Sequence, residues 1–152
     1  MRWSASEDWR AAFDSVFLGA LRLARTVAAR LSESGSIALV LSTSVRSPIG
    51  GLAISNGLRP GLGMLTKQLA DELGPRGIRV NGLLPGRVAT DRTLSLDGDD
   101  PAARSRNEAA IALRRYGEPA EFGRAAAFLL SPAASYITGS LLAVDGGALR
   151  AM

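Results

Sequence analysis

The sequence predicts a single α/β domain, residues 1–152, built on a parallel sheet of the doubly wound kind. Three short apolar runs, at residues 37–41, 78–84 and 140–144, show little alternation, as expected of strands covered on both faces. Helical patterns separate the runs, so right-handed crossovers should join the strands. Three strands are few for such a domain, and a long apolar helix precedes them. We therefore expect the second half of a larger fold.

Composition narrows the possible functions. The chain is 47% hydrophobic and 21% charged, which is ordinary for a globular domain. It has no cysteine and no histidine, which excludes disulfides, thiol nucleophiles, histidine acid–base catalysis and the usual zinc sites. No apolar run reaches the roughly 18 residues of a membrane span, and the first residues lack the apolar core of a signal peptide. We expect a cytoplasmic protein with no membrane partner.

The net charge of +4 does not indicate a nucleic-acid partner. Of the 18 basic residues, all but Lys67 are arginine, and they are spread along the chain without a basic run or interleaved aromatic residues. The acidic residues do not indicate a metal site either. Asp91 and the acidic run at residues 97–100 lack further ligands and are expected to be solvated.

The first element should be a long helix ending near Leu31. Ser4 and Glu7 have the spacing of a capping box, and Ser6 is a second possible cap. From Trp9 onward, apolar residues follow helical spacing and spread beyond one stripe. A helix that is apolar over so much of its girth should be buried on two sides, against the sheet and against a partner helix.

A strand at residues 37–41 and a second helix should follow. Ser42 stands at the carboxyl end of this strand, and residues 46–51 form a loop rich in proline and glycine. Leucines then recur every three or four residues from Leu58 to Leu73. Because proline belongs in the first turn of a helix, we expect a late start near Pro60 or an irregular first turn.

The central strand stops at Pro85 and Gly86. Proline cannot donate a ladder hydrogen bond, and glycine reaches backbone angles closed to other residues. Residues 87–90 therefore lie beyond the carboxyl end of the strand, where open α/β sheets bind ligands.

The rest of the chain should alternate between loops and short elements. We expect a polar loop at residues 91–100, a helix at 101–113, a turn at 114–118, and a helix from Pro119 that Ser131 and Pro132 end. Tyr116, Tyr136 and Asp145 are interpreted as packing and turn residues.

Three motifs resemble those of the short-chain dehydrogenase/reductase family, and they occur in the same order and at similar spacing. The first is GIRVN at residues 77–81 with Pro-Gly-x-Val-x-Thr at 85–90, the second is Arg-x-Gly-x-Pro at 115–119, and the third is YITG at 136–139 leading to VDGG at 144–147. The resemblance spans nearly the whole chain and is strongest to 3-oxoacyl-carrier-protein reductases.

The resemblance implies a Rossmann-type fold, an NAD or NADP cofactor, and hydride transfer to or from a small carbonyl or alcohol. It also implies a homo-oligomer in which the two long helices form a four-helix bundle. Pro85, Gly86, Val88 and Thr90 would meet the nicotinamide; the alternative is a plain strand-ending turn. The family's glycine-rich phosphate loop and first four strands are absent from these 152 residues, so we expect its C-terminal portion.

The catalytic positions of the family are altered. Its Tyr-x-x-x-Lys aligns with Ser55 and Arg59, its catalytic serine with Ser42, and its asparagine with Val16. A serine hydroxyl lacks the acidity of a phenol, and no imidazole is present to activate it. Arg59 can supply positive charge and bond a cofactor ribose, but its pKa is too high for proton exchange. Alternatively, Ser42 caps local backbone, and Ser55 and Arg59 are an ordinary helix start.

Two functions follow from these observations. The chain is either part of an NAD(P)-dependent oxidoreductase or a divergent member of that family, or it is a catalytically silent oligomerisation or scaffold protein. In either case, the missing strands would leave an apolar sheet edge and helix face uncovered. We therefore expect the isolated chain to be oligomeric or poorly soluble.

Overall fold

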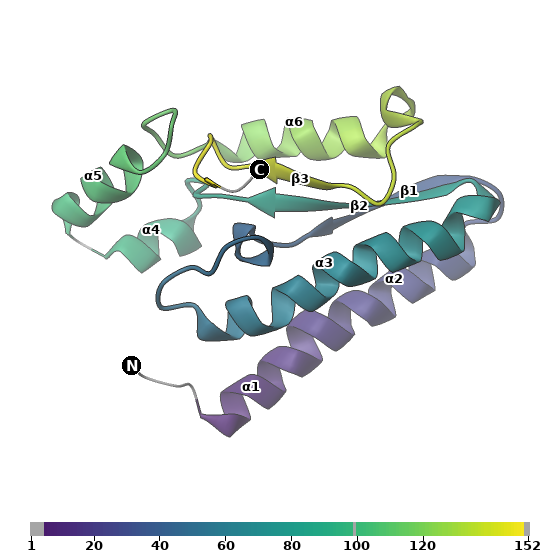
Figure 1. Ribbon diagram of the computed structural model, residues 1–152, viewed down its shortest axis with the longest axis horizontal. Coiled ribbons are helices and arrows are strands. Elements are labelled where there is room, and N and C mark those ends of the chain that lie inside the picture. The colour runs from purple at the N-terminus through teal and green to yellow at the C-terminus, as the bar shows by residue number, and fades with distance from the viewer. Residues whose placement is uncertain (1–4, 99, 151–152) are drawn as a thin grey trace.

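The computed structural model describes residues 5–98 and 100–150 and has a three-layered α/β architecture. Strands β1 (Gly35–Val40), β2 (Ile78–Pro85) and β3 (Leu141–Val144) form a parallel sheet in the order β1-β2-β3. Ile37 pairs with Val80, and Leu84 pairs with Ala143. The helices before β1 and between β1 and β2 lie on one side of the sheet, and the long helix before β3 lies on the other (Figure 1). The predicted fold class is confirmed.

The first helical segment consists of α1 (Ser6–Ala12), a π-helical stretch (Phe13–Leu18) and α2 (Gly19–Arg30) without a break. The prediction that Ser6 caps this segment is wrong, because Ala5 is the N-cap residue and its N–H donates to the Asp8 carboxylate at 3.2 Å. The predicted cap Ser4 lies outside the described residues. Burial is one-sided: Ala24 faces the core, whereas Leu23 is 66% exposed.

Helix α3 (Ala53–Leu73) begins seven residues before Pro60, so the predicted late start is wrong. The reason is tertiary packing, which here outweighs helix propensity. Three glycines let α3 approach large side chains so closely that a Cβ would stand within 3 Å of them: Gly57 against Trp9, Gly61 against Phe17, and Gly63 against Val45. These contacts hold the first half of α3 against the first helical segment and the end of β1.

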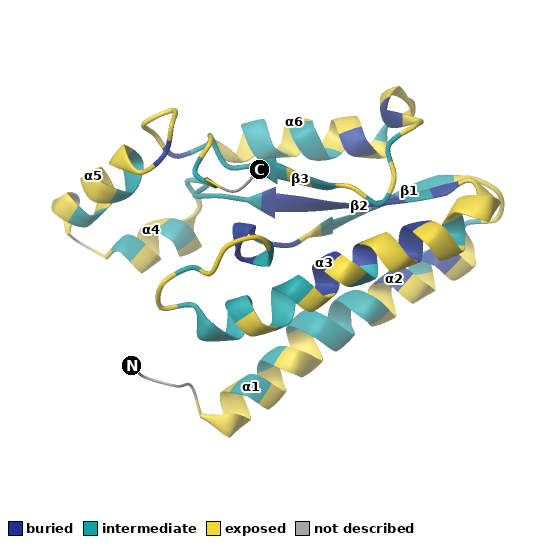
Figure 2. Cartoon of the chain, in the orientation of Figure 1, coloured by how far each residue is buried: buried dark blue, intermediate teal, exposed yellow. Residues whose placement is uncertain are grey.

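The core lies on both sides of β2. Val80, Leu83 and Leu84 have no exposed surface. One part of the core is formed with α2 and α3, and another with α6 (Pro119–Leu130). Figure 2 shows β2 as the most continuously buried element of the sheet. Its near-continuous apolar run is therefore explained by cover on both faces.

Two short helices lie beyond the carboxyl ends of the strands (Figure 1). Residues 91–97 form α4 (Asp91–Asp97), so the predicted polar loop is wrong there. Thr90 caps this helix, its hydroxyl accepting a hydrogen bond from the Thr93 N–H at 3.4 Å. Helix α5 (Pro101–Ala109) starts where predicted but ends four residues before Leu113.

Strand β1 is an edge strand in the part of the chain that the structure describes. It pairs with β2 on one side only, and Val40 is 57% exposed. A shallow groove between this edge and α2 is lined by Ala20, Leu23 and Val40. In the same described part, no helix is long and apolar enough to cross a membrane.

Gly77 should be hard to replace, because its φ is +71° and a Cβ would stand 2.8 Å from the Glu33 carbonyl oxygen. We expect Gly77→Ala to lower the free energy of unfolding by about 1–2 kcal/mol. Gly123, inside α6, is the matched control, since it has no positive φ and a Cβ placed there would meet nothing within 4 Å. Gly123→Ala should be neutral or stabilising by up to about 1 kcal/mol. Urea unfolding followed by circular dichroism measures both, and equal effects would contradict this account.

Candidate active site

A pocket of about 790 Å³ opens at the carboxyl ends of β1 and β2, a size typical of small-molecule sites. Five of the seven predicted site residues line it: Ser42, Ser55, Arg59, Pro85 and Gly86. Val88 and Thr90 are not among the lining residues. Val16, which the resemblance aligns with the family's asparagine, also lines the pocket.

The serines at the pocket form a chain of local contacts. The Ser42 hydroxyl accepts a hydrogen bond from the Ser44 N–H at 3.1 Å, so it caps the turn that follows β1. The buried Ser44 hydroxyl lies 3.0 Å from the Ser55 hydroxyl in the first turn of α3. Sequence reasoning missed Ser44, although it stands only two residues after Ser42. The Ser44–Ser55 pair fixes the position of Ser55 relative to the end of β1.

Arg59 lies one helical turn after Ser55 and caps the exposed end of β1. Its Nη1 donates to the carbonyl oxygens of Val40 and Leu41, at 3.1 and 2.8 Å. Burial and then the positive charge of Arg92 lower the pKa of Arg59. The guanidinium nevertheless stays a cation, so it supplies charge and hydrogen bonds rather than a proton.

Close packing requires a glycine at position 86. A Cβ there would lie 2.6 Å from the Cβ of Asp145, so glycine lets the turn after β3 close onto the end of β2. Asp145 accepts hydrogen bonds from the N–H groups of Gly147 and Leu149, at 2.9 and 2.8 Å. This turn places Leu149 in the pocket wall.

The side chains of Val88 and Thr90 lie just outside the pocket. Val88 forms an isolated parallel bridge with Gly117, and the Ala89 N–H donates to the Gly117 carbonyl oxygen at 2.8 Å. The Thr90 hydroxyl caps α4 and lies 3.1 Å from the Thr93 hydroxyl. Both residues thus anchor the segment after β2 between α4 and the turn before α6.

Asp97 is not solvated, contrary to the prediction. Its side chain is 6% exposed and accepts three hydrogen bonds, from Arg87 Nη1 at 2.6 Å, the Tyr116 hydroxyl at 2.5 Å and Asn107 Nδ2 at 2.9 Å. We call these four residues the Asp97 cluster. It ties α4 and α5 to the end of β2, and no sequence signal distinguished Asp97 from the acidic residues around it.

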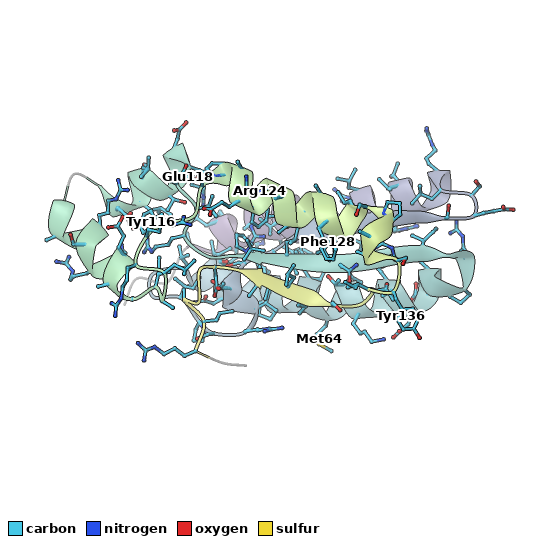
Figure 3. All side chains as sticks on the ribbon, turned by 90° about the horizontal axis from the view of Figure 1, so that it is seen from above. Met64, Tyr116, Glu118, Arg124, Phe128 and Tyr136 are labelled. Atoms are coloured by element: carbon cyan, nitrogen blue, oxygen red, sulfur yellow. The ribbon has the colours of Figure 1, made fainter. Side chains whose placement is uncertain are left out.

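Tyr116 is the aromatic centre of the Asp97 cluster. The guanidinium groups of Arg87 and Arg104 lie over its ring, 5.7 and 5.4 Å from the centroid. Burial first, and then the hydrogen bond to Asp97, raise the pKa of Tyr116. Figure 3 shows Tyr116 at the α5 end of the molecule and Tyr136 at the opposite end. Tyr136 is fully exposed, so its interpretation as a packing residue is wrong.

Within the described residues, no three histidine, cysteine, aspartate or glutamate side chains gather as a metal site would require. The polar groups of the pocket lining are hydroxyl, guanidinium and backbone groups and the side-chain amide of Asn107.

Comparison with known proteins identifies the class. Residues 3–148 match the family described as enoyl-(acyl carrier protein) reductase. The chain is 39% identical to an uncharacterized oxidoreductase of Mycobacterium tuberculosis over 94% of its own length and 56% of that protein. It is 36% identical to a 3-oxoacyl-[acyl-carrier-protein] reductase of Synechocystis, covering 93% of this chain and 56% of that protein. The chain belongs to the short-chain dehydrogenase/reductase family, as its motifs predicted, and spans about half the length of these relatives.

Solved structures agree with this assignment. A putative NAD(P)-dependent gluconate 5-dehydrogenase from Beutenbergia cavernae, with bound NADP at low occupancy, superposes with a TM-score of 0.92 at 32% identity over 97% of this chain and 60% of its own. A short-chain oxidoreductase from Pseudomonas aeruginosa, described as containing an atypical catalytic center, gives a TM-score of 0.88 at 27% identity over 98% of this chain and 61% of its own.

Removing the Tyr116 hydroxyl should weaken the fold measurably. We expect Tyr116→Phe to lower the free energy of unfolding by about 1.5–3 kcal/mol, the range for a buried hydrogen bond to a charged group. Tyr136→Phe is the matched control and should have no effect, because that side chain is fully exposed. Urea unfolding of the two variants beside the wild type tests this, and a Tyr116→Phe value equal to that of the control would refute the role of the cluster.

Proposed function

We propose that the protein is an NAD(P)-dependent oxidoreductase that transfers hydride between a nicotinamide cofactor and a small carbonyl or alcohol. One observation carries the proposal: Ser55, Arg59 and Gly86 surround a single pocket at the carboxyl ends of the parallel strands. Family membership supports the reaction class. The cytoplasmic location remains a prediction from the sequence.

The residues present fit the nicotinamide-ribose end of such a cofactor. Arg59 keeps three N–H groups beyond the Nη1 that bonds the β1 carbonyls, and these suit ribose hydroxyls. The backbone at Pro85 and Gly86 would face the nicotinamide. When bound, the cofactor supplies or accepts the hydride. Solved relatives described with bound NADP and with bound NAD support this part of the proposal, without a preference between the two.

Proton transfer to the substrate is the step that the side chains of this pocket support least. The Ser55 hydroxyl can donate a hydrogen bond to a substrate oxygen, and the Ser44 hydroxyl can hold it in that orientation. Neither hydroxyl has the acidity of a phenol, and Arg59 holds its protons too tightly to exchange them. We infer that water delivers the proton and that turnover is slow. The relative with an atypical catalytic center is a precedent for an altered site within the family.

The second candidate is a catalytically silent oligomerisation or scaffold protein. It is favoured by the contacts of Ser55, whose hydroxyl lies against Ser44 rather than beside a basic group. A silent protein would keep the fold and the pocket without turning over any substrate.

The two candidates are separated by restoring the family's residues. In the protein at its native length, Ser55→Tyr with Arg59→Lys should raise the rate of NAD(P)H oxidation, measured over a panel of small ketones and aldehydes, by about 10²-fold or more, since positioned acid–base groups contribute that much. Ser55→Phe with Arg59→Lys supplies the ring without the acidic hydroxyl and should give no gain. No NAD(P)H binding and no gain in the tyrosine variant would leave the scaffold candidate standing.

We also propose that the chain forms homo-oligomers through its two long helical segments. The exposed apolar surface on this side includes Phe13, at 43%, and Met64, at 74%. Single exposed apolar residues are common, but two helices packed side by side offer a continuous face.

Light scattering with two charge substitutions tests this assembly. Met64→Arg, on α3, should dissociate an oligomer held by the helices. Val40→Arg, on the edge strand β1 and outside both helical segments, should leave that oligomer intact. A monodisperse wild-type monomer would contradict the proposal, and dissociation by Val40→Arg alone would place the interface at the sheet edge.

A further inference from the structure

The pocket has an uneven charge. Its lining includes three arginines, Arg59, Arg87 and Arg92, and no aspartate or glutamate. Charges in a cleft with apolar walls act more strongly than charges on an open surface. The pocket is therefore positive unless its arginines are neutralised by acidic residues outside the lining.

Acidic residues among those described neutralise only one of the three arginines. Arg87 pairs with the buried Asp97, with 2.6 Å between Nη1 and the carboxylate oxygen. This pair accounts for the charge of Arg87. Among the described residues, no ion pair involves Arg59 or Arg92.

The two remaining arginines have hydrogen-bonding capacity to spare. Arg59 uses only Nη1, and its partners are uncharged carbonyl groups. Arg92, in the first turn of α4, donates to no described residue and is exposed at the pocket. The charge of Arg92 helps to lower the pKa of Arg59, so the two guanidinium groups repel each other across the pocket. An anion placed between them would relieve that repulsion and accept hydrogen bonds from both.

We propose that the ligand of this pocket carries an anionic group, a carboxylate or a phosphate, that binds between Arg59 and Arg92. Guanidinium groups suit both anions, because their parallel N–H groups match two oxygens of a carboxylate or phosphate. The inference rests on the proposed function for the identity of the ligand: the anion belongs either to an acidic carbonyl or alcohol substrate or to a phosphate of the cofactor.

Anion binding is measured without enzymatic turnover, so the test also applies to a catalytically silent protein. Inorganic pyrophosphate is titrated into the protein by calorimetry at constant ionic strength. Arg92→Gln should weaken binding roughly tenfold, the lower end for hydrogen bonds to a charged group. Arg92→Lys should recover part of the loss. Arg124→Gln, on α6 and outside the pocket lining, is the matched control and should have no effect.

Two paired probes identify the source of the anion. Acetoacetate is compared with its neutral methyl ester, and nicotinamide mononucleotide with the phosphate-free riboside. If Arg92→Gln weakens acetoacetate but not its ester, the substrate carries the anion; if it weakens the mononucleotide but not the riboside, the cofactor carries it. The proposal is overturned if the wild type binds none of the anions, or if Arg92→Gln and Arg124→Gln have equal effects. Unfolding curves confirm that the variants are folded.

Discussion

The burial of β2 on both faces is the constraint on which the rest of the structure depends. A strand with Val80, Leu83 and Leu84 fully enclosed requires helices above and below the sheet. Buried backbone and side-chain polar groups must then find partners inside the protein. Asn81, also fully buried, meets this demand by donating to the Ile137 carbonyl oxygen at 2.8 Å and accepting from the Ser140 N–H at 3.0 Å.

The same constraint links the first motif to the third. The Val80 N–H donates to the Thr138 hydroxyl at 3.0 Å, and the Gly139 N–H donates to the Val80 carbonyl oxygen at 2.7 Å. The Arg79 guanidinium donates to the carbonyl oxygens of Leu129 and Ser131 at the end of α6, at 2.7 and 3.0 Å. The segments that lead into β3 are therefore held by β2 itself.

The sequence predicted those elements whose positions depend on local residue patterns. Apolar runs and strand breakers located all three strands and the end of β2, and Pro101 and Pro119 located the starts of α5 and α6. The predictions failed where contacts between segments distant in the sequence determine the structure. The start of α3 depends on the contact of Gly57 with Trp9. Helix α4, which ends at the buried Asp97, lies where a polar loop over residues 91–100 was predicted. In the site, pattern and resemblance identified Ser55 and Arg59, but the partners Ser44 and Arg92 could not be recognised without knowing which segments meet.

The motifs that carry the family resemblance serve the fold more than the chemistry. In the second motif, Arg115 donates two 2.7 Å hydrogen bonds to Glu121, and with the Glu118 N–H this lowers the pKa of Glu121 to about 2. That arrangement starts α6, and none of its three residues lines the pocket. Because such contacts stabilise the scaffold whatever side chains line the pocket, the motifs do not depend on the residues that the resemblance aligns with the catalytic pair, Ser55 and Arg59. Activity must therefore be judged from the hydroxyl and guanidinium groups that line the pocket, whose charge favours an anionic ligand even where proton transfer is weak.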